Sequence, residues 1–443
     1  MADDGALTAP ERAVATLREA VALSPADETA ISWVESWRLT AATRGGAARA
    51  PLAEHVVQVR VIEAGRLGIH RTAGCDVAEL SSSIRAAMAL ARAAPLLPDD
   101  VELTPGDASP VEGGPPLHDD ALAALTAEEA QQRLRDLTME GETARLAWSE
   151  TALTVVTSRG LSRHLRATGA ALEVRCGRHP GAGSAAAAAR TLAGLDAPAV
   201  FARARRRDTV GETASWSAPT AVVLAAEATA ALIAAFGRHG LAAAAWEEER
   251  SFGRRHRGAQ TLAHGLTLVE DGSRGGGLPF PLDPAGARRR PATLVGDGVL
   301  HGPVADPLEA GRLGVPITRP TVTGDEGAPE HLFALPGGVA EDDLLAAAGD
   351  GVFVGHLDPL DCWDDCLLSA RAVARGVHRI ERGALAAPLP DAVWELSLPQ
   401  ALAAVRALGA ELVAVEGGRG ALGGTAAPAA LLAPVGDWRP LGT

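Results

Sequence analysis

The densest group of chemically capable side chains lies in the segment GHLDPLDCWDDC, residues 355–366. His356, Cys362 and Cys366 stand there among four aspartates. Imidazole and thiolate groups are the ligands that zinc prefers, and cysteines four residues apart would share one face of a helix. The alternative is an acidic loop around one buried tryptophan, with two cysteines acting as small hydrophobic residues. We favour the loop, because Cys-x-x-x-Cys without a second ligand pair is a weak metal signature.

A second candidate is Glu227, which stands alone in the stretch VVLAAEATAALIAAFG, residues 222–237. Every other residue of this stretch is small or apolar, and the pattern predicts a helix over 226–238. Three interpretations are open: a catalytic base, a solvent-exposed helix residue, or the remnant of a dismantled site. Isolated glutamates on helices are most often exposed, so we expect no chemical role for this one.

The composition excludes several classes of enzyme. The sequence contains no lysine, so it has no P-loop lysine, no Schiff-base lysine and no kinase-type strand lysine. No Gly-x-Ser-x-Gly occurs, which removes the serine-nucleophile elbow of the α/β-hydrolases.

Charge and cysteine content bear on location. A formal charge of −14 disfavours direct binding to nucleic acid or to anionic membranes, and we interpret the arginine clusters at 203–207 and 288–290 as solvated loop ends. Four cysteines in 443 residues do not make a disulfide framework. The sequence shows neither a secretory signal nor an apolar run long enough to span a bilayer, so we expect a cytoplasmic protein with no membrane association.

Periodicity predicts the elements of an α+β fold. We expect helices over 11–23, 77–94 and 126–144, a hairpin turning at Gly65, and a longer hairpin turning at residues 158–160. The alanine-rich segment from Ser184 to Asp196 would form a helix on propensity alone.

The organisation predicted is an N-terminal α+β domain over 1–100, a linker with a central hairpin and helix domain over 101–215, and a β-rich C-terminal domain over 216–443. In the last domain, short apolar runs alternate with glycine and aspartate turns. This spacing is typical of a large, mostly antiparallel curved sheet with peripheral helices, which we expect at 226–238 and 397–408.

The order of these segments resembles the TldD/PmbA family over nearly the whole chain, from Glu11 to Pro434. Its members were once described as modulators of DNA gyrase, and the resemblance implies a peptidase that works as TldD–TldE pairs. The clearest pieces are RVIEAGRLGIHRTAGCDVAELSSSIRAAMALA, VVTSRG and LTLVEDGSRGGGLPFPLDPAGARRRPATLVGDGVLHGPVADPLEAGRLG.

The resemblance also implies where a zinc site would lie. In TldD subunits a His-Glu-x-x-x-His helix follows a strand, and a cysteine near the carboxyl end completes the ligands. Here Ala226 and Ala231 stand at the histidine positions, Glu227 at the position of the base, and Leu422 where the cysteine is expected. Alanine and leucine have no lone pair to donate to zinc. Ala285 and the segment Cys362–Cys366 also depart from the family pattern, which suggests a divergent member in a specialised pathway.

We therefore expect a TldE/PmbA-like subunit with no catalytic residue, metal ligand or cofactor of its own. It would form a heterodimer with a zinc-bearing TldD-like subunit and shape the chamber in which that partner cleaves peptides or a peptidic intermediate. Two alternatives stay open. One is a hydrolase with a re-sited metal or Cys/His centre at His356, Cys362 and Cys366, and the other is an adaptor that binds gyrase or a toxin–antitoxin component.

Overall fold

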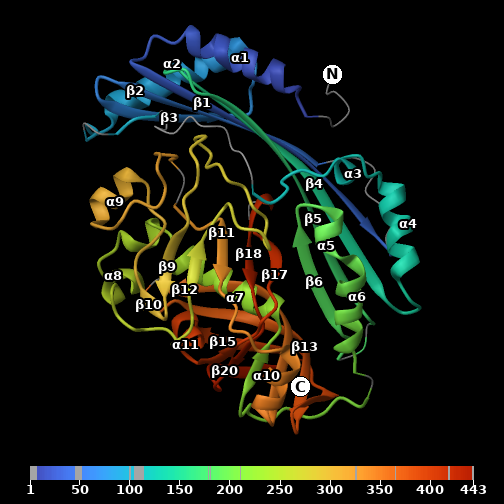
Figure 1. Ribbon diagram of the computed structural model, residues 1–443. Coiled ribbons are helices and arrows are strands. Elements are labelled where there is room, and N and C mark those ends of the chain that lie inside the picture. Colours follow the sequence, from blue (N-terminus) through green and yellow to red (C-terminus); the bar gives the residue numbers. More distant parts are fainter. Residues whose placement is uncertain are drawn as a thin grey trace.

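The fold is seen in a computed structural model, which describes residues 7–44, 52–98, 101–103, 114–177, 179, 181–209, 211–324, 327–364, 366–417 and 420–441. Three sheets form its framework (Figure 1). Nearly all strand pairs are antiparallel, and β11·β18 and β12·β7 are the parallel ones among the described strands. The α+β class predicted from the sequence is therefore confirmed, with the mostly antiparallel sheets that it expected.

The first sheet has the strand order β3-β2-β1-β4-β5-β6. Its strands are β1 (Glu28–Ala42), β2 (Leu52–Glu63), β3 (Arg66–Thr72), β4 (Thr143–Thr157), β5 (Ser162–Arg175) and β6 (Ser184–Ala189). Both predicted hairpins are present, as β2–β3 and β4–β5. The sheet runs across residue 100, because β1 pairs with β4 from Ala30↔Thr157 to Ala42↔Arg145. The first two predicted segments thus share one sheet.

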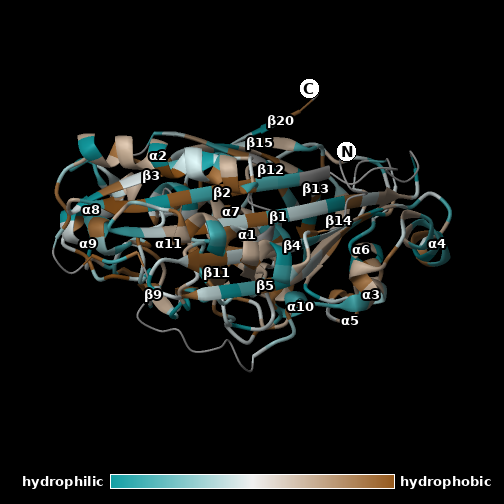
Figure 2. Ribbon diagram, turned by 90° about the horizontal axis from the view of Figure 1, so that it is seen from above, coloured by the Kyte–Doolittle hydropathy of each residue, from teal (hydrophilic) through white to brown (hydrophobic). Residues whose placement is uncertain are grey.

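Helices cover one face of this sheet, and the C-terminal part of the chain lies against the other (Figure 1). The helices are α1 (Pro10–Ala22), α2 (Val77–Ala93), α3 (Asp120–Ala123), α4 (Ala127–Leu137), α5 (Leu192–Leu195) and α6 (Ala197–Arg206). Hydrophobic and hydrophilic residues mix along β1 and β2 (Figure 2). Val57, Val59 and Val61 pack under α1 and α2, whereas Arg60, equally buried, donates from Nη1 to the carbonyl of Val322 at 2.9 Å. The alternation thus separates a helix-covered face from a face toward the C-terminal part.

The C-terminal part contains two sheets. One has the order β10-β9-β8-β11-β18-β17 and consists of β8 (Leu268–Glu270), β9 (Ala292–Gly296), β10 (Val299–Leu300), β11 (His331–Ala334), β17 (Val413–Gly417) and β18 (Gly420–Ala427). The other has the order β16-β19-β7-β12-β13-β15-β20, with β14 beside β13. It consists of β7 (Val222–Leu224), β12 (Gly351–Asp364), β13 (Ser369–Glu381), β14 (Ala384–Pro388), β15 (Ala392–Ser397), β16 (Val405–Leu408), β19 (Ala430–Leu432) and β20 (Asp437–Pro440).

Helix α7 (Ala226–Gly240) follows β7 and lies in the hydrophobic core that these two sheets share. The remaining helical segments are η1 (Ala244–Trp246), α8 (Phe252–His256), α9 (Pro307–Leu313), α10 (Glu341–Ala348) and α11 (Leu398–Ala403). The helix predicted over 226–238 is present, whereas the one predicted over 397–408 ends at Ala403 and strand β16 follows it. Among the residues described, no helix combines the length and the apolar character needed to cross a bilayer.

Candidate functional site

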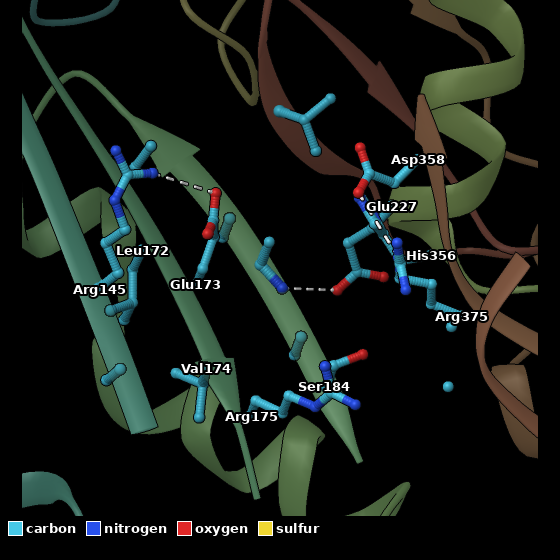
Figure 3. Close-up of a pocket in the computed structure, with 18 of the residues that line it drawn as sticks. Arg145, Leu172, Glu173, Val174, Arg175, Ser184, Glu227, His356, Asp358 and Arg375 are labelled. Carbon is cyan, nitrogen blue, oxygen red and sulfur yellow. Dashed lines mark hydrogen bonds and ion pairs between the residues drawn. The ribbon is translucent and has the colours of Figure 1, made fainter. Parts of the chain in front are cut away.

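A cleft of about 810 Å³ separates the inner face of the first sheet from the C-terminal part. Strands β4, β5 and β6 form one wall, and α7, β12, β13 and β17 contribute the opposite side. Figure 3 shows Arg145, Glu173 and Arg175 on the first wall, with His356 and Arg375 facing them. The cleft thus lies where the two halves of the fold meet.

The register of the first sheet explains what its wall presents. Ala42, Arg145, Glu173 and Ala186 are successive partners across β1, β4, β5 and β6, so their side chains share one face. Two residues along each strand, and so on the same face, Thr143 pairs with Arg175, and Arg175 with Ser184. In the opposite direction along the strands, the cross-strand partners on this face are Ala147, Ala171 and Ala188. This wall is therefore charged at one end and lined by small apolar side chains toward the other.

Glu227 lies at the opposite side of this cleft, in the first turn of α7, and is only 2% exposed. Its carboxylate accepts from Arg203 Nε at 3.3 Å, from Arg207 Nη1 at 3.1 Å and from the Ala186 N–H at 3.0 Å. Burial opposes ionisation, but the charges of Arg207 and Arg203 outweigh it and hold the pKa of Glu227 below its ordinary value. The expectation of a solvent-exposed glutamate is wrong, because these contacts enclose the carboxylate.

The arginines that hold Glu227 belong to the cluster that we interpreted as solvated. Arg203 and Arg207 are instead buried, at 7% and 2% exposure. Arg207 also donates from Nη2 to Glu341 at 2.8 Å, and its guanidinium lies 5.5 Å from the centroid of the Phe353 ring. In the second cluster Arg289 is likewise enclosed, by Glu270 and Glu330, whereas Arg206 and Arg290 are exposed as expected. Sequence-distant carboxylates are the physical reason for both corrections.

Glu227, Arg203 and Arg207 also cap the free edge of the first sheet. Strand β6 pairs with β5 on one side only, so its other side presents backbone groups without strand partners. There Glu227 accepts from the Ala186 N–H, Arg203 Nη2 donates to the Ala186 carbonyl at 2.9 Å, and Arg207 Nη1 donates to the Ser184 carbonyl at 3.2 Å. The predicted helix over 184–196 is wrong in its first half for this reason. Its alanines form an edge strand whose free side is capped by these charged side chains.

The positions at which the resemblance expects zinc ligands do not fit the metal. Ala226 and Ala231 lie on α7, the first buried and the second in the lining of the cleft, and neither has a donor atom. Glu227 is enclosed by cations, and Leu422 lies in β18 with its side chain outside the described residues. In the part of the chain that the structure describes, no three His, Cys, Asp or Glu side chains gather to hold an ion. No reaction step through zinc can be assigned to these residues.

The structure does not assemble the alternative set either. His356 and Cys362 both lie on β12, not on a helix, and Cys366 follows in the turn. Six residues along a strand span roughly 20 Å, too far for one ion. His356 lines the cleft, whereas Cys362 packs against the apolar core and Trp363 is 59% exposed. The tryptophan that we expected to be buried is thus exposed.

Six charged residues of the cleft were not singled out from the sequence: Arg145, Glu173, Arg175, Arg375, Arg44 and Glu416. A signal for the first three exists, since they occupy alternate positions on the two strands of the predicted hairpin. Arg375 is placed by β13, where its guanidinium lies 3.5 Å from Asp358 and 3.1 Å from Asp391. That arrangement depends on strand pairing that a single sequence does not reveal.

Comparison with known proteins places this geometry in context. Residues 217–435 match the family model described as the PmbA/TldA metallopeptidase C-terminal domain. No curated protein sequence matches the chain. The structure is similar to that of TldE from Thermococcus kodakarensis, with a TM-score of 0.75 and 17% identity, over 96% of this chain and 99% of that one.

Two further solved structures share the fold. A proposed modulator of a DNA gyrase from Thermotoga maritima has a TM-score of 0.74 at 17% identity, over 93% of this chain and 96% of its own. A second proposed gyrase modulator, from Bacteroides thetaiotaomicron, has a TM-score of 0.71 at 16% identity, over 97% and 99%. The fold extends along almost the full length of each of them. The match at 217–435 confirms the TldD/PmbA family that the sequence resembles.

Proposed function

We propose that this chain is a TldE/PmbA-like subunit that carries out no catalysis itself and pairs with a zinc-bearing TldD-like chain. In the complex its cleft forms part of the chamber that delivers peptides to the partner's metal. One observation supports this above all: the helix that would carry the metal site has alanines at both histidine positions, and its glutamate is held by two buried arginines. A carboxylate whose pKa is held down by two arginines is a weak general base.

Several features make a chamber-forming role physically reasonable. The cleft is within the 300–1,000 Å³ range of small-molecule and cofactor sites, and the alanines of its floor carry short side chains. Its walls come from two halves of the fold tied together by the buried ion pairs of Arg207 with Glu227 and Glu341. A pathway that handles a peptide or a peptidic natural-product intermediate would suit such a site.

The test is co-expression with a neighbouring reading frame that has an intact His-Glu-x-x-x-His. We expect a stable complex by size-exclusion chromatography, one zinc per complex by elemental analysis, and cleavage of unfolded peptides by the complex only. The matched controls are the partner with its motif glutamate replaced by glutamine, which should assemble without activity, and this chain alone. One tightly held zinc per isolated chain, or peptide cleavage by it, would overturn the proposal.

A further inference from the structure

Charge in the cleft is mostly neutralised within the fold. Glu227 is paired with Arg207, Glu416 with Arg38 at 2.6 Å, and Asp358 with Arg375 at 3.5 Å. Arg145 and Glu173 lie 3.7 Å apart on neighbouring strands, which Figure 3 shows on the first wall. The acidic side chains of the cleft named here thus each have a cationic partner.

Two arginines of the lining are different. In the described part of the chain, neither the Arg44 nor the Arg175 side chain makes a hydrogen bond or an ion pair, and both are exposed. The unneutralised charge at this end of the cleft is therefore positive, although the whole chain carries −14. Guanidinium groups that are not used by the fold are available for a ligand carboxylate, which they bind through two parallel N–H···O bonds.

The spacing of the cations suits an extended peptide. Arg145 and Arg175 are diagonal neighbours on β4 and β5, so their Cα atoms lie about 7–8 Å apart. In an extended chain, side chains on one face repeat about every 6.6 Å, which is close to that distance. Arg44 follows two residues after Ala42, the partner of Arg145, at the same end of the sheet. Carboxylates two residues apart on a ligand would thus meet Arg175 and Arg145, the second of which already lies 3.7 Å from Glu173.

The remainder of the lining leaves room for the ligand backbone. Ala171, Ala186 and Ala188 form the neighbouring floor, and Gly355 and Gly376 approach Ser184 at its edge. None of them fills the space in front of the sheet with a long side chain. An extended segment can therefore lie along the cleft with its acidic groups at the arginine end.

From this arrangement we propose that the cleft selects peptides by their carboxylates, with Arg175 and Arg44 as the specificity-determining residues. The inference rests on the proposed role as a peptide chamber and names its substrate class. The carboxylates are either acidic side chains or the free carboxyl terminus of the peptide, because both present the same group to a guanidinium.

The experiment measures binding to the isolated full chain by fluorescence anisotropy, with three labelled decapeptide probes. The first alternates Glu and Ala and has an amidated carboxyl terminus, the second alternates Ser and Ala with a free carboxylate, and the third is the first with Lys in place of Glu. Tighter binding of the first identifies side-chain carboxylates, and tighter binding of the second identifies the terminal one. Equal binding of all three, or preference for the Lys probe, contradicts the proposal.

The variants Arg175→Gln and Arg44→Gln should each weaken binding of the preferred probe by about two- to five-fold, because exposed ion pairs are worth roughly 0.4–1 kcal/mol. The effect should decrease as salt is raised. Arg85→Gln is the matched control, since Arg85 is exposed on α2, which covers the other face of the first sheet, and the change in net charge is the same. Equal weakening by Arg85→Gln, or none by Arg175→Gln, refutes the assignment.

This result is separable from the test of the proposed function. If the isolated chain binds acidic peptides selectively but forms no complex with a zinc-bearing chain, the inference about carboxylates is supported and the subunit proposal fails. An active complex whose peptide preference is unchanged by Arg175→Gln would support the subunit proposal and overturn the inference.

Discussion

Glu227 illustrates how one side chain changes its role with its neighbours. At the position where the family resemblance expects a general base, it accepts from two buried arginines and from the backbone of an edge strand. A general base needs to reach a proton on a substrate or a water. This carboxylate instead joins α7 to α6 and β6, so its contribution is to the stability of the fold.

Glu227→Gln should therefore lower stability by roughly 3 kcal/mol, because it removes the buried negative charge that two buried guanidiniums share. The measurement is the denaturation midpoint followed by tryptophan fluorescence. Glu411→Gln is the control: Glu411 also lies near Arg203, at 3.8 Å, but is 76% exposed, and its change should be close to zero. A stable Glu227→Gln protein whose complex has lost peptidase activity would show instead that the residue is catalytic.

Elements could be predicted where local pattern and tertiary context agree. The valine alternation of β2 and the glycine turn at Gly65 gave the first hairpin, because both signals are local. The segment from Ser184 to Ala189 was missed, since alanine favours a helix and only the pairing with β5 and the caps from Glu227 and Arg203 make it a strand. Tertiary contacts override propensity at such positions.

A close approach between two elements supplies a prediction at this scale. Gly68 on β3 packs against α2, and a Cβ there would lie 1.9 Å from the Ala87 carbonyl oxygen. Gly68→Ala should therefore force α2 away from the sheet and lower stability by about 3 kcal/mol. Thermal melting measures the change, and backbone contact on the helix leaves no flexible side chain to yield.

Gly311→Ala is the matched control, because Gly311 lies in α9 and a Cβ there would contact nothing within 4 Å. That change should be neutral or stabilise the protein by up to about 1 kcal/mol. Equal losses from the two substitutions would contradict the close-packing argument.

For the whole molecule, acid should weaken the junction between the two halves. His378 on β13 is 1% exposed, and its Nδ1 lies 2.9 Å from Thr209 Oγ1. Burial lowers the pKa of His378 to about 4, with Asp208 opposing the shift and Arg207 adding to it. The unfolded chain takes up this proton near pH 6.5 but the folded one does so only near 4, so stability should fall as the pH drops through that interval.

Melting temperatures between about pH 7 and pH 4.5 test this expectation. His378→Gln should flatten the dependence, because glutamine has no proton to take up and can still bond to Thr209. His301→Gln, at an exposed side chain, should leave the slope unchanged. An identical slope in the parent and His378→Gln proteins would show that other groups control acid stability.

The candidate site was predictable only in part. The sequence located α7, since its pattern is local. The assignment of Ala226 and Ala231 to ligand positions rests on the family resemblance alone. The sequence did not reveal that Arg203, Arg207 and Glu227 form one buried group, because that group joins residues 20 and 24 positions apart. The arginines of the cleft could not be predicted from the sequence either, because strand pairing determines which face of the sheet they occupy.

The pairing of β1 with β4 has a consequence for biosynthesis. Roughly 100 residues separate the end of β1 from the start of β4, so a ribosome needs about 5 to 20 s to supply the second strand. During that interval the nascent β1–β2–β3 unit exposes an unpaired 15-residue strand edge. The emerging polypeptide must therefore avoid self-association until translation has passed residue 157, and chaperones that shield strand edges should associate with it at this stage.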